Sequence, residues 1–96
     1  MIQSFGDDPT EDVYHGTDSR AAREIPRTIW PVVRRKLDVI NAAQVLGDLR
    51  APPGNRLEAL KGSRSGTYSI RVNDQFRITF RFEGGNAYDV KCEDYH

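Results

Sequence analysis

A helical repeat of apolar residues occupies the middle of the chain. Val33, Leu37 and Ile40 recur at intervals of three and four residues, and charged side chains fill the opposite side of the repeat. This spacing is typical of an amphipathic helix that covers an apolar surface, and it predicts a helix over residues 28–46. Shorter helical pieces are expected over residues 10–16 and 19–24. Thr10 and Thr28 are the expected N-caps, and Pro31 falls in the first turn of the long helix. Gly16 and Gly47 are expected to end the first and the long helix.

From residue 68 onward the repeat of apolar residues shortens to two. Hydrophobic and polar side chains alternate over residues 68–72, 76–82 and 88–95, and the breaks between these runs contain Asn-Asp and Gly-Gly-Asn. Alternation with such short turns predicts an antiparallel meander of three strands, in which Tyr88 shares its side with Val90 and Cys92. Residues 56–60 are expected to add a strand beside it, and residues 1–5 a short further one.

The long helix and the meander each have one apolar side that must be buried. A chain of 96 residues is enough for one domain, which we expect to span residues 1–96. The apolar side of the long predicted helix is the only surface of matching size that could cover the apolar face of the sheet. The sequence therefore predicts an α+β fold in which N-terminal helices pack on one face of an antiparallel-dominated sheet of about four to five strands.

The alternation also places cationic side chains on the face of the sheet that the helices cannot cover. Four cations on neighbouring strands repel one another unless anions lie among them. Two interpretations stay open. One is a floor that binds the phosphates of a polyanion, and the other is a lattice of cross-strand salt bridges in which Asp89 and Glu93 neutralise two of the cations. The side chains on this face are Arg71, Arg77, Arg81, Lys91 and Tyr95.

Charge is distributed unevenly along the chain, although the formal net charge is zero. Thirteen of the fourteen lysines and arginines lie within residues 20–81, whereas residues 1–19 contain five acidic residues and no Lys or Arg. A basic middle rich in arginine indicates a polyanionic partner, because guanidinium groups bind phosphate in a bidentate fashion. The other interpretation is a solvated surface on which the charges are mixed in space.

Several kinds of chemistry find no support in the sequence. There is no Cys/His cluster with metal-ligand spacing, no glycine-rich phosphate loop after a strand and no GxSxG elbow. We therefore expect no metal site and no cofactor. Cys92 falls on the same side of its predicted strand as the core residues, so it is expected to pack in the core. No apolar run reaches the roughly 18 residues of a membrane span, and the first nine residues do not resemble a signal peptide, so we expect a cytoplasmic protein.

The chemistry that suits the remaining residue types is metal-free cleavage of RNA. RNA supplies its own nucleophile, the 2′-hydroxyl next to the scissile phosphate. An enzyme must deprotonate this hydroxyl, stabilise charge on the phosphoryl oxygens and protonate the leaving 5′ oxygen. Arginine and lysine suit the second task, and lysine, tyrosine and histidine suit the proton transfers. The composition permits this mechanism without requiring it.

Three stretches carry a specific combination of motifs: Leu57-Glu58-Ala59-Leu60-Lys61-Gly62, then Ser69-Ile70-Arg71-Val72-Asn73-Asp74-Gln75-Phe76-Arg77-Ile78-Thr79-Phe80, and the terminal Asp94-Tyr95-His96. This combination resembles the HigB-type toxins of the RelE/ParE superfamily, which belong to type II toxin–antitoxin systems. The resemblance spans nearly the whole chain and implies a RelE-like fold. It also implies a ribosome-dependent endoribonuclease that cuts mRNA in the ribosomal A site. The implied antitoxin is of the HigA type, with a helix-turn-helix domain through which operator DNA is contacted only indirectly.

The resemblance further implies roles for individual residues. Lys61, Arg77, Tyr95 and His96 are the expected catalytic set. Arg77 is expected to bind phosphate and stabilise transition-state charge, and Lys61 to bind phosphate or act as a base. Tyr95 and His96 are expected to orient the nucleotide or carry protons. The expected RNA-binding residues are Arg64, Arg71, Arg81 and Asp94, of which Arg71 is included for its parity and charge.

Two positions depart from the family pattern. Some members carry a histidine where Glu58 stands and an arginine close to Asn73. We interpret Glu58 as a solvated strand residue, with a proton-handling role as the alternative. Two other functions remain as alternatives: a ParE-like inhibitor of DNA gyrase on the same fold, against which the expected catalytic set argues, and a non-catalytic nucleic-acid-binding module.

Overall fold

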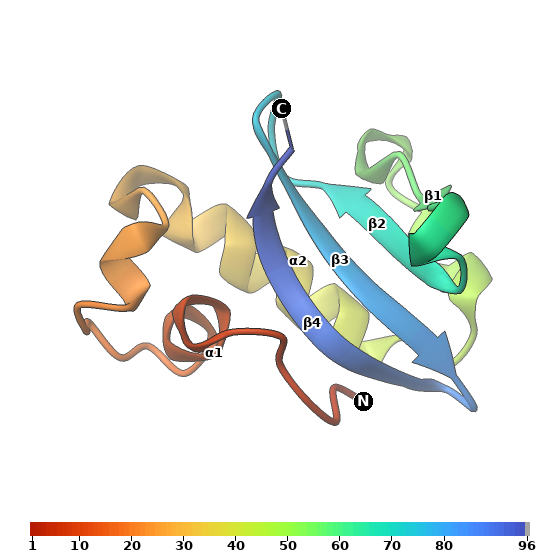
Figure 1. The fold of residues 1–96 in the computed structure, drawn as a ribbon, viewed down its shortest axis with the longest axis horizontal. Coiled ribbons are helices and arrows are strands. Elements are labelled where there is room, and N and C mark those ends of the chain that lie inside the picture. Colours follow the sequence, from red (N-terminus) through yellow and green to blue (C-terminus); the bar gives the residue numbers. More distant parts are fainter. Residues whose placement is uncertain (96) are drawn as a thin grey trace.

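Two helices precede a four-stranded sheet in the computed structural model of the protein, which describes residues 1–95. The strands follow the order β1-β2-β3-β4, and each is antiparallel to the next. Helix α2 crosses behind strands β3 and β4 in Figure 1. The predicted α+β architecture, with helices on one face of the sheet, is confirmed.

The helices are α1 (Asp8–Tyr14) and α2 (Trp30–Ala42), and the strands are β1 (Glu58–Ala59), β2 (Thr67–Arg71), β3 (Phe76–Glu83) and β4 (Asn86–Asp94). Between them lie the 3₁₀ turns η1 (Ala22–Glu24), η2 (Arg27–Ile29), η3 (Leu46–Arg50), η4 (Pro53–Asn55) and η5 (Gly62–Arg64).

The first helix begins two residues earlier than the sequence predicted. Asp7 is its N-cap, and its carboxylate accepts the backbone N–H of Thr10 at 3.0 Å. Thr10 therefore lies inside the helix, and the prediction that it is the N-cap was wrong. Its buried hydroxyl oxygen instead accepts the backbone N–H of Cys92 on β4 at 2.8 Å. This hydrogen bond ties α1 to the sheet.

We expect the substitution Thr10→Val to lower the free energy of unfolding by about 1–3 kcal/mol, because it leaves the buried N–H of Cys92 without an acceptor while keeping the side-chain volume. Thermal or urea unfolding measures the change. Thr28→Val is the matched control, because Thr28 is exposed and its hydroxyl forms no helix-capping bond. Equal stability of the two variants would contradict the expectation.

Helix α2 buries the predicted stripe but is shorter than predicted. Val33, Leu37 and Ile40 are fully buried. The helix starts at Trp30 after the η2 turn, so Thr28 is not its N-cap. It ends at Ala42 rather than near residue 46, because the carboxylate of Asp48 accepts the backbone N–H groups of the two residues before η3, Gln44 and Val45. Gly47 therefore lies within η3 and does not terminate the helix.

The core forms where α2 meets the inner face of the sheet. Ile70, Ile78, Phe80 and Val90 are fully buried on that face. The predicted strand at residues 56–60 shrinks to the two residues of β1, paired with Tyr68 and Ser69. The predicted N-terminal strand appears only as two isolated parallel bridges to β4, from Ile2 and Phe5. No helix among the described residues has the length and apolar character needed to cross a bilayer.

An irregularity in β4 changes which side chains face outward. Thr79 pairs with Lys91 and Arg81 pairs with Tyr88, so β4 contains one extra residue between these pairs. Asp89 sits in this bulge with φ 54°. The bulge reverses the alternation, so Tyr88 lies on the outer face, with its ring centroid 5.2 Å from the guanidinium carbon of Arg81. The prediction that Tyr88 shares the side of Val90 was wrong, because a two-residue repeat cannot reveal a bulge.

Candidate functional site

The sheet face turned away from α2, here called the open face, carries three cross-strand rows. Arg71, Arg77 and Glu93 form one row, Ser69, Thr79 and Lys91 the second, and Thr67, Arg81 and Tyr88 the third. Three arginines and a lysine thus gather on neighbouring strands, as the alternation predicted. Arg71 and Arg77 are direct cross-strand neighbours in the first row, an arrangement in which like charges repel.

Arg77 lies at the centre of the first row and is held by neutral acceptors. Its Nε donates to the hydroxyl of Ser69 at 2.9 Å, and one Nη donates to the carbonyl oxygen of Arg56 at 2.6 Å. Only 8% of the residue is exposed. No carboxylate of the described residues forms an ion pair with it. Arg77 is therefore a largely buried cation without a described counter-charge, which is costly unless an anion binds there.

The burial of Arg77 differs from the solvent-facing floor that the sequence suggested. Ser69, the carbonyl group of Arg56 after the η4 turn and the ring of Tyr95 all lie against the side chain. The second terminal nitrogen, Nη1, forms no hydrogen bond among the described residues, and none of their buried side-chain nitrogens lacks a partner. Nη1 is therefore the part of the guanidinium that reaches solvent, and it is the part that could contact a phosphate.

Tyr95 lies next to this guanidinium. Its ring centroid is 5.6 Å from the guanidinium carbon of Arg77, and 42% of the residue is exposed. Its backbone N–H donates to the carbonyl oxygen of Gln75 at 2.7 Å, which fixes the chain end against the hairpin between β2 and β3. The structure thus brings Arg77 and Tyr95 together, with an aromatic face available beside a cation.

The other arginines of the expected RNA-binding set have carboxylate partners. Arg81 pairs with Asp89 across the strands at 2.9 Å, Arg64 of η5 pairs with Glu93 at 2.6 Å, and Arg71 pairs with Asp74 of the adjacent turn. The salt-bridge lattice is therefore present in part, although Glu93 pairs with an arginine outside the strands. Lys91 forms no ion pair among the described residues. Lys91 and Arg77 are the cations of the open face that this lattice leaves without a carboxylate.

Glu93 forms hydrogen bonds with Arg64 and Thr79 and lies near the charge of Lys91. Burial alone would raise the pKa of its carboxyl group, but hydrogen bonds from Arg64 and Thr79 and the charges of Arg64 and Lys91 outweigh that effect, and the pKa is lowered. Glu93 therefore stays ionised and holds η5 against β4. A hollow of about 460 Å³ lies here on the open face, lined by Arg64, Thr79, Arg81, Lys91 and Glu93 among others.

This lowered pKa predicts an acid-dependent loss of stability. A carboxyl group whose pKa falls on folding stabilises the folded protein above its unfolded value, near 4.5, and this contribution is lost as the pH falls through the folded value. The melting temperature of the wild type should exceed that of Glu93→Gln by a constant amount between about pH 5 and 7, and the gap should narrow progressively as the pH falls below about 4.5. Glu83→Gln, which changes an exposed carboxylate without an ion pair among the described residues, is the control. A gap for Glu93→Gln that does not narrow at all as the pH falls below about 4.5 would contradict the assignment.

Lys61 and Asp94 form no described hydrogen bond or ion pair with Arg77. Lys61 is exposed where η5 begins and lines neither of the two hollows described. Asp94 pairs with Phe76, so its register places it with the inner face of the sheet, where its exposed carboxylate accepts an amide N–H of Gln75 at 2.9 Å. His96 lies outside the described residues. Thus the structure gathers Arg77, Tyr95, Arg71 and Arg64 on the open face and separates Asp94 from them.

Cys92 packs in the core, as its parity predicted. It is buried, and burial, with smaller contributions from Asp7 and Glu93, raises the pKa of its thiol to about 12. Its sulfur is therefore protonated near neutral pH and unsuited to nucleophilic chemistry. Among the described residues there is also no group of three or more His, Cys, Asp or Glu side chains that could hold a metal ion.

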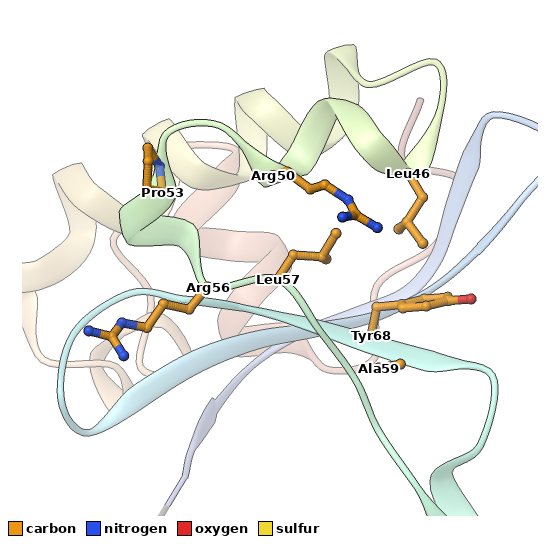
Figure 2. Close-up of a pocket in the computed structure, with 7 residues that line it drawn as sticks. All are labelled: Leu46, Arg50, Pro53, Arg56, Leu57, Ala59 and Tyr68. Carbon is orange, nitrogen blue, oxygen red and sulfur yellow. The ribbon is translucent and has the colours of Figure 1, made fainter.

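A second hollow, of about 390 Å³, lies on the helix side of the sheet edge. Figure 2 shows Leu46, Leu57 and Tyr68 converging on it from η3, the segment before β1, and β2, with the guanidinium of Arg50 above them. None of the residues in the open-face rows lines it, and it shares no lining residue with the hollow beside Glu93, so the two hollows are separate.

Sequence reasoning missed the partners that hold Arg77. Ser69 has the parity of the open face and pairs with the strand that carries Arg77, so cross-strand register could have indicated it. The carbonyl group of Arg56 and the buried side chain of Asn55 gave no signal, because they lie in a segment whose pattern reads only as a break between elements.

The arrangement of the chain matches that of known small toxins. The YoeB-YefM complex from Staphylococcus aureus aligns with a TM-score of 0.62 at 16% identity, covering 100% of this chain and 98% of that one. The YoeB/ParE toxin from Agrobacterium tumefaciens aligns with a TM-score of 0.58 at 14% identity, covering 98% and 99% of the two chains. At these identities the likeness defines the fold, which is the RelE-like α+β fold of this class of toxins.

Sequence comparison gives the family. The family model described as the RelE-like toxin of type II toxin-antitoxin system HigB matches residues 3–96. Toxin HigB-1 from Vibrio cholerae is 44% identical over 95 residues, covering 99% of this chain and 98% of its own. Endoribonuclease HigB from Proteus vulgaris is 41% identical over 64 residues, covering 67% and 68% of the two chains. The chain belongs to the HigB family of RelE-like type II toxins, as its motifs indicated.

Proposed function

We propose that this chain is a ribosome-dependent endoribonuclease that cuts mRNA in the ribosomal A site by attack of the RNA 2′-hydroxyl. The observation that carries the proposal is Arg77, a largely buried cation that lies against Tyr95 and has no described carboxylate partner. A fixed guanidinium of this kind is suited to stabilise charge that develops on a phosphoryl group. Membership of the family and the relative named an endoribonuclease support the same activity.

In the proposed reaction, Arg77 and Lys91 stabilise the phosphoryl oxygens and Tyr95 orients a nucleotide. Lys61 and His96 carry the protons: one accepts the proton of the 2′-hydroxyl and the other protonates the leaving 5′ oxygen. The bond from the 2′ oxygen to phosphorus forms as the bond to the 5′ oxygen breaks. The products are a 2′,3′-cyclic phosphate and a 5′-hydroxyl, and no co-reactant is consumed.

The paired arginines have a different part in this proposal. Arg64, Arg71 and Arg81 can bind RNA by exchanging their carboxylate partners for phosphates, because each pair is at least partly exposed. Their contribution should therefore depend strongly on salt. Asp94 is expected to contact RNA from the end of β4 rather than from the open face.

A protein partner is part of the same proposal. Membership of a type II toxin family and the neighbours solved as YoeB-YefM complexes support neutralisation by an antitoxin. We propose an antitoxin of the HigA type, with a helix-turn-helix domain that binds operator DNA. The cytoplasm, where ribosomes translate mRNA, is the proposed location.

Primer extension on mRNA from a translation reaction tests the activity. Cleavage should occur within codons when ribosomes are present and should disappear when they are omitted, and the fragments should carry a 2′,3′-cyclic phosphate. Inhibition of purified gyrase without any cleavage would overturn the proposal in favour of a ParE-like function. RNA binding that Arg77→Ala abolishes, with mRNA left intact by the wild type, would overturn it in favour of a non-catalytic module.

A further inference from the structure

The carbonyl group that accepts from Arg77 belongs to a residue with an unusual backbone. Arg56 follows the η4 turn with φ 46° and ψ 56°, a left-handed conformation that non-glycine residues adopt rarely. Its N–H donates to the carbonyl oxygen of Pro53 at 3.2 Å, and its own carbonyl oxygen accepts from Arg77 at 2.6 Å. In Figure 2 the side chain of Arg56 points away from Leu46 and Tyr68. It is thus the backbone of Arg56, set by the η4 turn, that contacts Arg77.

The η4 turn is fixed by a single buried side chain. Asn55 is fully buried, and its amide nitrogen donates to the carbonyl oxygens of Leu49 at 3.2 Å and Ala51 at 3.1 Å. Its amide oxygen accepts from the amine of Lys36. Asn55 therefore uses both ends of its amide to attach the turn to η3 and to helix α2.

Lys36 is an unusual partner for this purpose. It is half-buried on α2 and hydrogen-bonds to a neutral amide, with no ion pair to a described carboxylate. Burial, followed by the charges of Arg35 and Arg71, lowers the pKa of its amine. A cation kept among other cations contributes little to stability. It does connect the rigid helix to the turn that holds Arg77.

We propose that Lys36 and Asn55 are positioning residues for Arg77: through the η4 turn they place the carbonyl group of Arg56 so that the guanidinium of Arg77 is held on the open face with Nη1 reaching solvent. This inference rests on the proposed function, because the stabilisation of charge on a phosphoryl group requires Arg77 to be held in an exact orientation. Neither residue contacts the phosphate itself. Their effect is transmitted through one backbone carbonyl group.

The test compares mRNA cleavage by the full-length wild type, Asn55→Ala, Lys36→Met and Lys36→Arg. A misplacement of a reacting group by about 1 Å can cost about 10²-fold, so we expect kcat to fall about 10²-fold in Asn55→Ala and about tenfold in Lys36→Met, with KM within about twofold. Lys36→Arg keeps a donor to Asn55 and should restore most of the activity. Asn41→Ala is the control, because Asn41 is a half-buried asparagine of α2 whose amide oxygen accepts the backbone N–H of Ile2 at 2.9 Å and makes no contact with the η4 turn among the described hydrogen bonds.

A second readout separates positioning from general stability. The Nε–H resonance of Arg77, identified by its absence in Arg77→Lys, should shift and exchange faster in Asn55→Ala and Lys36→Met but not in Asn41→Ala. The double variant Asn55→Ala/Arg77→Lys gives a further comparison. If Asn55 acts through Arg77, Asn55→Ala should lower kcat much less in Arg77→Lys than in the wild type. If its effect is merely structural, it should lower kcat by the same factor in both. Lys36→Met keeps most of the side-chain volume, so it remains informative if Asn55→Ala does not fold.

The outcomes also distinguish this inference from the proposed function. If Arg77→Ala cleaves mRNA at the wild-type rate, the role proposed for Arg77 fails. If Arg77→Ala is inactive while folded Lys36→Met and Asn55→Ala keep the wild-type kcat and an unmoved Arg77 resonance, the positioning role alone is overturned.

Discussion

Replacing Arg77 by alanine is expected to slow mRNA cleavage by about 10²–10³-fold, because it removes a preorganised donor from the place where charge develops on the phosphate. The guanidinium is held by Ser69 and by the carbonyl oxygen of Arg56, so it needs little rearrangement when substrate binds. Arg77→Lys keeps the charge, but an ammonium group cannot reproduce the fixed fork of donors. It should therefore also be impaired, although less than alanine. Initial cleavage rates by primer extension measure both effects.

The matched control for this prediction is Arg23→Ala. Arg23 lies on η1 and forms an exposed ion pair with Asp18, so its removal subtracts one positive charge from a residue outside the rows of the open face. Its cleavage rate should stay close to the wild type. Melting temperatures of all three variants identify any loss of folding, which matters because Arg77 also ties β2 and β3 to the η4 turn. Equal activity of folded Arg77→Ala and Arg23→Ala would contradict the prediction.

The second large effect is expected at Tyr95. Its ring is partly exposed beside the Arg77 guanidinium, a position suited to stacking on a base of the mRNA. Base stacking on an aromatic side chain contributes about 1–3 kcal/mol, so Tyr95→Ala should lower kcat/KM by about 5–150-fold. Tyr95→Phe keeps the ring and should retain nearly full activity. The measurement is single-turnover cleavage of mRNA bound to ribosomes.

Tyr88→Ala provides the comparison for Tyr95. Tyr88 also lies beneath a guanidinium on the open face, but its partner Arg81 is neutralised by Asp89. We expect a much smaller loss of cleavage there. If Tyr95→Phe is as inactive as Tyr95→Ala, the hydroxyl rather than the ring is essential, and a proton-carrying role replaces the stacking role.

Much of the fold could be predicted because its signals are local. The stripe of Val33, Leu37 and Ile40 is a property of helical spacing, and the alternation over β2 and β3 is a property of the pleated strand. The ends of the helices were less predictable. Asp7, rather than Thr10, caps the start of α1, and Asp48 accepts the N–H groups of the two residues that precede η3, where the helix had been expected to continue to Gly47. Several side chains could serve at each end, and only the path of the chain decides which one is in reach.

The candidate site could be predicted only in part. Strand parity placed Arg71, Arg77 and Arg81 on one face, and the pairing register agrees. Strand parity does not show how deeply each side chain is buried or which carboxylate forms an ion pair with it. Arg64 joins Glu93 across 29 positions of sequence, and Arg77 reaches Arg56 across 21. Contacts of that separation depend on how the turns pack.

The sequence by itself determined the family, the α+β class and the outward direction of the cationic row, because each follows from motifs or from repeats between near neighbours in the chain. Only the tertiary structure decided that Arg77 is enclosed without an ion pair among the described residues while Arg64, Arg71 and Arg81 are paired. It also decided that a bulge at Asp89 turns Tyr88 outward. These features depend on the compact chain, in which the η4 turn is brought against β2 and one strand is a residue longer than its partner.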